Sequence, residues 1–444
     1  MHTEQAHAKK ILFACVPGDG HFNPLTGLAK HLQQTGYDVR WYTSNLYKKK
    51  LDRMQIPHYD FVQAKDIPAE KIDELFPERS KIKNPIKKLN FDLEHYFIRR
   101  GPEYYADIRN IQKEFDFDLL IADVAFTGIP FVKDLLQKPV ISIGVFPLTE
   151  TSKDLPPSGL GMEPSYTLFG KVKQAALRFA AHKILFGKVN SFAHKLFKQY
   201  AVKTKGEFIF DIMAVKSDYL LQSGTPGFEY RRSDLSERVR YIGSLLPYRS
   251  STANNSQWYD ARLSKYEKVV VLTQGTVERD VNKLLVPALE AFKNSDVLVI
   301  CTTGGSQTEQ LRKQYPQQNI IIEDFISFDD VMPYADAYIT NGGYGGVMLG
   351  IEHRLPMVVA GINEGKNEIC ARIGYFKYGV NLKTETPTAE QLRKAVNEVL
   401  RNAEYKQNIE QLGEEFAQYN PNELTAKYVQ ELIGAAITSV QVRA

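Results

Sequence analysis

Short apolar runs alternate with helical patterns at the start of the chain. Ile11 to Val16 is entirely apolar and predicts a buried strand. A second strand is expected over Asp38 to Tyr42. Between them, apolar side chains recur at the spacing of one helix face, at Leu25, Leu28, Ala29 and Leu32. A strand, a helix and a strand within about thirty residues predict a βαβ unit of a parallel sheet.

The same alternation continues along the chain with one interruption. Further strands are expected over Leu119 to Ala122 and Val140 to Ile143, and a stretch rich in Pro, Ser and Asn follows. A second series of strands covers Lys268 to Thr273, Asp296 to Thr302, Asn319 to Ile322 and Ala337 to Thr340. We therefore predict an α/β protein with two Rossmann-like, doubly wound parallel-sheet domains that face a cleft. The expected domains are residues 1–230 and 259–444, with a linker over 231–258.

A dense glycine cluster directly follows the strand at Ala337 to Thr340. Its members are Gly342, Gly343, Gly345 and Gly346. A helical pattern, a short strand from Met357 to Ala360 and a polar loop from Gly361 to Glu368 come next. Glycines between a strand and a helix let the backbone approach a bulky anion, which the helix N-terminus stabilises. Many α/β proteins use such a turn only to pack a helix against a strand, so this segment alone leaves both interpretations open.

Two residues at predicted strand ends are candidates for acid–base chemistry. His21 follows the first strand in a loop, GDGHFNP, and Asp123 ends the strand LLIAD. Histidine titrates near neutral pH and can remove a proton from a hydroxyl, and ligands of open α/β sheets bind at strand ends such as that of Asp123. The plainer alternatives are a solvated loop histidine and an aspartate that caps a strand or helix. Asp19 is a less favoured partner for His21.

The amino-acid composition limits the classes of function that the protein can have. Hydrophobic residues make up 43% and charged residues 24%, as in ordinary globular proteins. The net charge of +4 is mild and argues against a nucleic-acid partner. No apolar run reaches the length of a membrane span, and no Cys/His spacing resembles a metal site. The three cysteines, at positions 15, 301 and 370, are far apart, and the expected setting is a reducing cytoplasm.

Two motifs together resemble a known family. GHFNPLTGLAKHL follows the first strand, and NGGYGG is followed by LP, VVAG and a loop ending in NEICAR. They resemble the G-H-x-x-P and HGG-x-G signatures of family 1 glycosyltransferases. The resemblance implies the GT-B fold, in which the last helix returns to the first domain. It also implies inverting sugar transfer from a UDP- or TDP-sugar co-substrate, with no metal ion or other cofactor.

The resemblance assigns roles to individual residues. His21 matches the catalytic base and Asp123 its partner acid. On the donor side, Gly275 and Thr276 match a loop that approaches the diphosphate, and Phe325 matches a side chain packed against the base, although a core phenylalanine is an equal alternative. The glycine cluster would hold the phosphates.

Three positions depart from the family pattern. Asn341 stands where a phosphate-contacting His is usual, and it can still donate a hydrogen bond. Leu349 stands where many members place a ribose-binding Glu. Gly365 and Lys366 replace the Asp-Gln pair that holds the sugar. Glu364 or Glu368 would then accept the sugar hydroxyls, and Lys366 would add a charge beside the sugar or phosphates.

The sequence leads to one function and leaves two alternatives open. The leading hypothesis is a monomeric enzyme that moves a hexose, glucose in the first place, from a UDP-sugar to a hydroxyl of a small lipophilic acceptor. The acceptor would contact aromatic segments from Phe91 to Tyr105 and from Phe146 to Phe169. A basic amphipathic segment from Phe169 to Tyr200 favours a membrane-surface enzyme with a lipid or carotenoid acceptor, unless it is only a solvated helix face. A nucleotide-sugar-binding protein without turnover is the third class.

Overall fold

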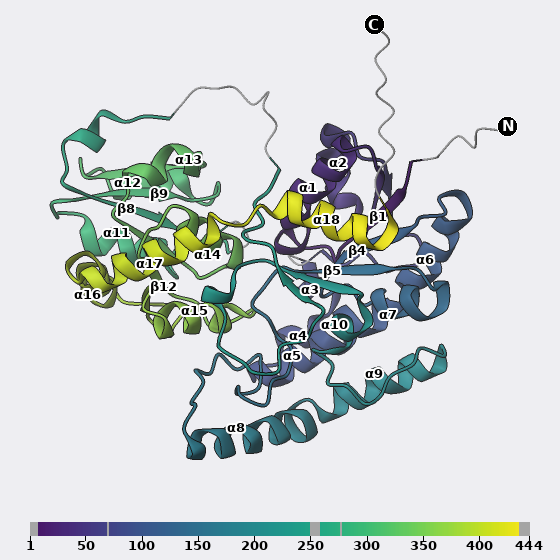
Figure 1. Ribbon diagram of the computed structural model, residues 1–444. Helices are drawn as coiled ribbons and strands as arrows, with labels where there is room; N and C mark the ends of the chain where they lie inside the picture. Colours follow the sequence, from purple (N-terminus) through teal and green to yellow (C-terminus); the bar gives the residue numbers. More distant parts are fainter. Residues whose placement is uncertain (1–7, 69–70, 249–257, 276–277, 435–444) are drawn as a thin grey trace, which may run out of the picture.

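The chain forms two α/β domains (Figure 1). The computed structural model describes residues 8–68, 71–248, 258–275 and 278–434. The first domain contains a seven-stranded sheet and the second a six-stranded sheet. All strand pairings in both sheets are parallel. The predicted fold class, with two Rossmann-like sheets, is therefore confirmed.

The strands have the order typical of doubly wound sheets, with a switch point beside the first strand of each domain. In the first sheet the order is β3 (His58–Tyr59), β2 (Asp38–Tyr42), β1 (Lys10–Ala14), β4 (Leu119–Asp123), β5 (Val140–Gly144), β6 (Tyr219–Gln222) and β7 (Val239–Tyr241). In the second it is β10 (Ile320–Glu323), β9 (Val297–Thr302), β8 (Lys268–Thr273), β11 (Ala337–Thr340), β12 (Met357–Val359) and β13 (Gly379–Asn381). Ligands bind at such switch points, so the topology places the expected site at the carboxyl ends of β1 and β4 and of β8 and β11.

Helices cover both faces of each sheet. Those before the second sheet are α1 (Asp19–Gln34), α2 (Lys48–Met54), α3 (Ile72–Leu75), α4 (Pro77–Ser80), α5 (Pro85–Asp92), α6 (Gly101–Glu114), α7 (Ile129–Phe131), α8 (Leu168–Ala180), α9 (Gly187–Gln199) and α10 (Ile212–Lys216). Those that follow are α11 (Leu285–Phe292), α12 (Thr308–Gln314), α13 (Phe328–Val331), α14 (Tyr344–Glu352), α15 (Lys366–Tyr375), α16 (Ala389–Arg401), α17 (Ala403–Phe416) and α18 (Pro421–Ile433).

The apolar strands are buried on both faces, because successive side chains point in opposite directions. In β1, Ile11 and Phe13 enter the core beneath α1 and α2, whereas Leu12 and Ala14 enter the core beneath α6 and α7. This two-sided burial explains why β1 reads as an unbroken apolar run rather than an alternating one.

The first sheet extends further along the chain than expected. β7 lies inside the stretch 231–258 that was predicted to be a linker, and it pairs with β6 as the edge strand. Only three residues long, β7 offers too few positions for a periodic pattern, and it shares its neighbourhood with Pro, Ser and Asn. The first sheet therefore includes residues beyond the predicted domain boundary at residue 230.

The last helix leaves the second domain and packs on the first. α18 crosses to α1 (yellow in Figure 1), where Val429 is fully buried in the same core as Ile11 and Phe13. The hydroxyl of Tyr219, the first residue of β6, donates to Glu431 at 2.9 Å.

The carboxyl ends of the two sheets are joined by a direct hydrogen bond. The hydroxyl of Tyr344, at the start of α14, donates to the carbonyl oxygen of Ser223, just after β6, at 2.6 Å. The loops that follow the strands of one domain thus contact those of the other. Among the described residues, none of the helices has both the length and the apolar character needed to cross a membrane.

Candidate active site

His21 and Asp123 form a close pair at the carboxyl edge of the first sheet. The Nδ1 atom of His21 lies 2.8 Å from Oδ1 of Asp123. Asp123 ends β4 and its side chain is completely buried, whereas 23% of the His21 side chain is exposed. His21 was expected in a loop, but α1 begins at Asp19, so this histidine lies in the first turn of the helix. The structure brings together the two residues predicted as base and acid.

The Asp123 carboxylate is held by backbone groups as well as by His21. Its Oδ2 accepts a hydrogen bond from the N–H of Val16 at 3.0 Å, and its Oδ1 accepts one from Ala125 at 2.9 Å. A carboxylate without a proton only accepts, so the tautomer of a neutral His21 that suits this pair donates from Nδ1 and has its lone pair on Nε2. Asp19, the less favoured partner, is instead paired with Lys50 at 3.2 Å.

The aromatic side chains predicted to contact the acceptor differ in their distance from His21. Tyr104 is buried in the core of the first domain, and Phe97 packs against that core. Phe146 also packs against that core, but its ring lies edge-on beside His21, at 6.5 Å between ring centroids. Core packing therefore accounts for part of the aromatic pattern, and Phe146 is the aromatic side chain next to the candidate base.

The glycine cluster forms a turn in which one position, Gly342, requires glycine. Gly342 has a φ of +75°, and a Cβ atom there would meet Sγ of Cys370 at 2.3 Å. Gly343 is the N-cap of α14, without a side-chain capping bond. A Cβ on Gly345 would meet nothing within 4 Å. The first N–H groups of α14 are therefore accessible from the solvent side, as an anion site at a helix N-terminus requires.

Asn341 connects the glycine turn to the neighbouring strand. Its Nδ2 donates to the carbonyl oxygen of Gln274, and its Oδ1 accepts from the N–H of Gly343 at 3.2 Å. The amide therefore braces the turns that follow β8 and β11. One N–H of its Nδ2 group remains for a ligand, so the predicted phosphate contact stays a prediction.

The other donor-side candidates surround this turn. Gly275 has a φ of +78° and lies next to Asn341, while Thr276 falls outside the described residues. Phe325 follows β10 and is 71% exposed, so it is not a core residue. Its ring lies against Gly305, in the loop after β9. An exposed ring at strand ends is compatible with the predicted contact to a nucleotide base.

Two charged candidates in the polar loop after β12, Lys366 and Glu364, differ in their exposure to solvent. Lys366 begins α15, and its side chain is mostly buried against Gly361, beside the carbonyl oxygen of Asn341. Its Nζ pairs with Glu364 at 2.7 Å, and the Glu364 side chain is largely exposed. Leu349 is buried in the core of the second domain, which agrees with its inability to bind a ribose hydroxyl.

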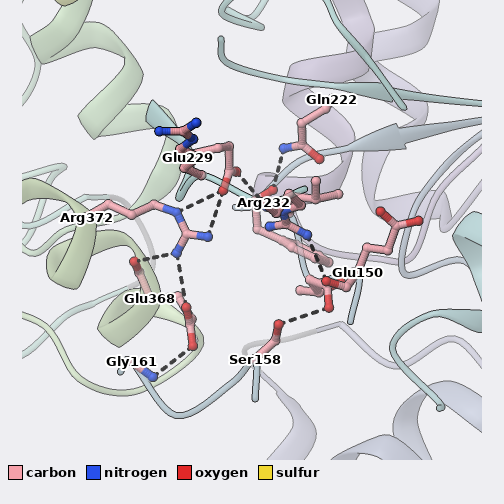
Figure 2. Close-up of polar contacts among 12 residues, drawn as sticks. Glu150, Ser158, Gly161, Gln222, Glu229, Arg232, Glu368 and Arg372 are labelled. Carbon is pink, nitrogen blue, oxygen red and sulfur yellow. Dashed lines mark hydrogen bonds and ion pairs between the residues drawn. The ribbon is translucent and has the colours of Figure 1, made fainter. Parts of the chain in front are cut away.

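Glu368, named as a further candidate for the sugar, is used elsewhere. Its Oε1 accepts hydrogen bonds from the N–H groups of Gly159 and Gly161, both at 2.8 Å, and its Oε2 accepts from Arg372 at 3.1 Å (Figure 2). These glycines belong to the first-domain segment between β5 and α8. Glu368 therefore fastens the start of α15 to the first domain.

Arg372, on the same helix as Glu368, makes another link between the domains. Its Nε and Nη2 donate to Oε2 of Glu229 at 3.1 and 2.8 Å, and Oε1 of Glu229 accepts from the N–H of Leu148 at 2.7 Å. The guanidinium also lies 4.5 Å above the ring of Tyr230. Burial alone lowers the pKa of Arg372, but Glu229 and Glu368 outweigh it and hold the pKa above its ordinary value.

Sequence reasoning missed the roles of Tyr344, Glu229 and Glu368 as interdomain contacts. Tyr344 interrupts a run of glycines, and that lone bulky side chain was the one signal in the sequence. Glu229 and Glu368 carry none, because both bind backbone N–H groups, which every loop contains.

Two further features bear on the site. In the ranges that the structure describes, His, Cys, Asp and Glu nowhere gather in groups of three or more that suit a metal ion. A cavity of about 620 Å³ lies between α1, α14 and α17, lined by His31 and Glu352 among others. None of the candidate site residues lines this cavity, so it is separate from the His21 pair.

Comparisons with known proteins bear on the family. Residues 287–432 match the family described as Erythromycin biosynthesis protein CIII-like, C-terminal domain. The whole chain is similar to the 4'-demethylrebeccamycin synthase of Lentzea aerocolonigenes, with 30% identity over 408 residues that cover 92% of this chain and 96% of the relative. The chain belongs to the family 1 glycosyltransferases.

Other comparisons extend this result. The glycosyltransferase is 30% identical over 434 residues to UDP-glucosyltransferase 1 of Beauveria bassiana, with 91% of each chain covered. It shares its fold with CalG4, the calicheamicin glycosyltransferase, at a TM-score of 0.73 and 17% identity over 97% of this chain and 99% of the other. The protein is thus an enzyme of the GT-B fold, and the alternative without turnover is set aside.

Proposed function

We propose that this glycosyltransferase moves glucose from UDP-glucose to a hydroxyl group of a small lipophilic acceptor, with inversion and without a metal ion or other cofactor. The observation that carries the proposal is the His21–Asp123 pair, with Nδ1 and Oδ1 2.8 Å apart at the carboxyl edge of the first sheet. Asp123 keeps the proton on Nδ1 and stabilises the imidazolium that forms when Nε2 accepts a proton. His21 acts in this proposal as the general base.

The donor side supplies positive potential without a metal. In this proposal the diphosphate binds at the N-terminus of α14, which has no side-chain cap and where Gly345 leaves the backbone open to solvent. Lys366 lies beside the same turn and contributes a cation, whose charge is partly balanced by Glu364 at 2.7 Å. These groups would stabilise the departing nucleotide diphosphate, which gains negative charge as the sugar leaves. Gly275 lies next to Asn341 in this site, and Phe325 and Thr276 are assigned to it from the family resemblance.

The identities of the nucleotide and the sugar are supported by the relatives. The Beauveria bassiana protein is named as a UDP-glucosyltransferase, as are two relatives from Starmerella bombicola. A lipophilic acceptor is supported by the ring of Phe146, which lies beside His21. A reducing cytoplasm is proposed because Cys15, Cys301 and Cys370 are all free and buried. The enzyme is proposed to act as a monomer.

The test combines donor binding with turnover. UDP-, TDP- and GDP-glucose are added to the purified protein, and the rise in Tm is measured for each. UDP release is then measured with UDP-glucose and a hydrophobic phenol as acceptor. We expect the largest Tm rise with UDP-glucose, and we expect His21→Ala to keep that rise while losing turnover by about 10²–10⁴-fold.

His31→Ala is a matched control, because His31 lies on the same helix with a similar exposed fraction, 20% against 23%. It should keep both properties. If no nucleotide sugar raises Tm, the donor proposal is wrong. If His21→Ala keeps full turnover, the assignment of the base is wrong.

A further inference from the structure

Helix α8 presents large apolar side chains to solvent. Leu168 is 86% exposed and Phe169 80%, and Val172 and Phe179 are also mostly exposed. At 100° per residue these four side chains, with the exposed Ala176, fall within about a third of the helix circumference. Soluble proteins seldom leave such a contiguous apolar face uncovered, and one of this kind marks an interaction surface.

The opposite face of α8 is anchored, so the helix cannot turn its apolar face inward. Gln174 is buried, and its Oε1 accepts from the N–H of Ser165 at 2.6 Å while its Nε2 donates to the carbonyl oxygen of Asp154 at 2.9 Å. Arg178 donates to the carbonyl oxygen of Leu155. The loop over 154–165 thus fixes which side of α8 faces outward.

The segment of chain that contains this face is strongly basic. No Asp or Glu occurs between Glu163 and Glu207. The same stretch contains nine cationic residues: Lys171, Lys173, Arg178, Lys183, Lys188, Lys195, Lys198, Lys203 and Lys205. Lys171 and Lys173 are exposed and lie on the two flanks of the apolar face. An apolar face bordered by lysines is the pattern of a helix that lies in the interface of an anionic membrane.

We infer that α8 docks this glycosyltransferase onto the surface of an anionic lipid bilayer. Leu168, Phe169, Val172 and Phe179 enter the headgroup region, and the flanking lysines bind the anionic headgroups. The charge of the segment selects this occupant over a second copy of the chain. A symmetric contact through α8 would bring two sets of the same cations together, which opposes association.

Docking of α8 to a bilayer would also determine how the acceptor reaches the enzyme. This step rests on the function proposed above. The loop over 154–165 is bonded on one side to α8 and on the other to Glu368, through Gly159 and Gly161. A bilayer bound to α8 therefore lies next to the loop that joins the two domains. A lipophilic acceptor dissolved in the bilayer would reach the first domain without crossing water.

The test is sedimentation of the intact protein with lipid vesicles at low salt. We expect pelleting with phosphatidylcholine vesicles that contain phosphatidylserine, none with phosphatidylcholine alone, and release at high salt because lysine–headgroup attraction is screened. The double variant Phe169→Ser with Phe179→Ser should lower the bound fraction at least about tenfold. Lys171→Glu with Lys173→Glu should abolish the preference for phosphatidylserine.

Matched controls replace equally exposed residues elsewhere. Val62→Ser with Tyr259→Ser removes two exposed apolar side chains, and Arg393→Glu with Lys394→Glu reverses two exposed cations on α16. Both controls should pellet like the unchanged protein. The Tm rise with UDP-glucose, measured without vesicles in every variant, reports on the donor site independently.

Two results would overturn the inference while leaving the proposed function intact. One is the absence of pelleting with phosphatidylserine vesicles when the UDP-glucose Tm rise is normal. The other is a dimer in size-exclusion chromatography that Phe169→Ser with Phe179→Ser dissociates, which would assign the face of α8 to a second copy of the chain.

Discussion

Arg372 and Glu229 form a buried ion pair that joins the second domain to the first, with Nη2 and Oε2 2.8 Å apart. The two side chains are only 2% and 3% exposed. Glu229 lies between β6 and β7 of the first sheet, and Arg372 lies on α15, the helix that begins at Lys366. Each charged group is therefore buried only while the two domains are in contact.

Removing either partner of this pair should be costly, and the two losses should not add. Arg372→Met leaves the Glu229 carboxylate buried without its counter-ion, and we expect a loss of about 3–5 kcal/mol in the free energy of unfolding. Glu229→Gln should cost a similar amount. The double variant should lose less than the sum of the two, as denaturant unfolding of all four proteins will show. Additive losses would mean that the pair has no special coupling.

Glu368→Ala should loosen the first-domain loop without unfolding the protein. The N–H groups of Gly159 and Gly161 lose their acceptor, and we expect their hydrogen exchange to accelerate by about 10–100-fold. The amides of β8 and β11 provide the internal control and should exchange as before. Equal acceleration throughout the second domain would indicate general destabilisation instead.

Gly342 and Gly345 should respond differently to the same substitution. Gly342→Ala forces a Cβ onto Cys370 at a positive φ and should destabilise the protein by about 2–4 kcal/mol. Cys370→Ala in addition should restore part of that loss, because it relieves the clash but not the backbone strain. Gly345→Ala meets no atom within 4 Å and should keep its Tm while weakening the Tm rise with UDP-glucose, if the diphosphate approaches there. Thermal unfolding with and without UDP-glucose measures both effects.

Asp123→Asn should impair catalysis more than folding. The amide can donate to His21 Nδ1 and so favour the tautomer with its proton on Nε2, which cannot accept the acceptor's proton. In a Ser-His-Asp enzyme the same change lowers kcat about 10⁴-fold, and we expect a loss of about 10²–10⁴-fold here. Asp19→Asn is the control, since Asp19 pairs with Lys50, and it should keep turnover. The proposal predicts a loss in kcat with little change in the Tm rise from UDP-glucose.

Asp211 should make the stability of the protein depend on pH. Burial raises its pKa from 3.8 to about 6, and its Oδ1 accepts from the N–H of Thr151 at 2.8 Å. The folded state therefore holds this proton more tightly than the unfolded state, so its contribution to stability is present near pH 4 and is lost as pH rises to about 6. Asp211→Asn keeps the acceptor without the charge, and it should raise stability at pH 7.5 by up to about 3 kcal/mol but change little at pH 4. Unfolding curves at both pH values decide this.

Chemistry and position are both visible in the sequence for His21 and Asp123. Each lies at the end of an apolar run, and parallel strands bring their carboxyl ends to the same edge. The strand pattern indicates only that both residues lie near the carboxyl edge of the sheet. Their direct contact, observed at 2.8 Å, was expected from the resemblance to family 1 glycosyltransferases. The glycine turn was visible for the same reason, because Gly342 and its neighbours follow a recognisable strand.

The interdomain contacts could not be derived in that way. Glu368 binds Gly159 and Gly161 more than two hundred positions away, through backbone groups that have no sequence signature. The strands β7 and β13 have only three residues each, too short for a periodic pattern. The exposure of Phe325 to solvent could not be predicted from the sequence either, because a phenylalanine near a strand end is compatible with a core position.

The return of α18 makes the first domain discontinuous in sequence. Val429 and Thr425 are fully buried, and Tyr37 donates to the carbonyl oxygen of Gly434 at 3.1 Å. A chimaera that exchanges the first domain of this enzyme for that of a relative must therefore exchange residues 421–434 as well. A single crossover in the segment between the sheets would leave the introduced first domain with the original α18. The core of that domain would then contain α18 side chains that evolved to pack against a different sequence.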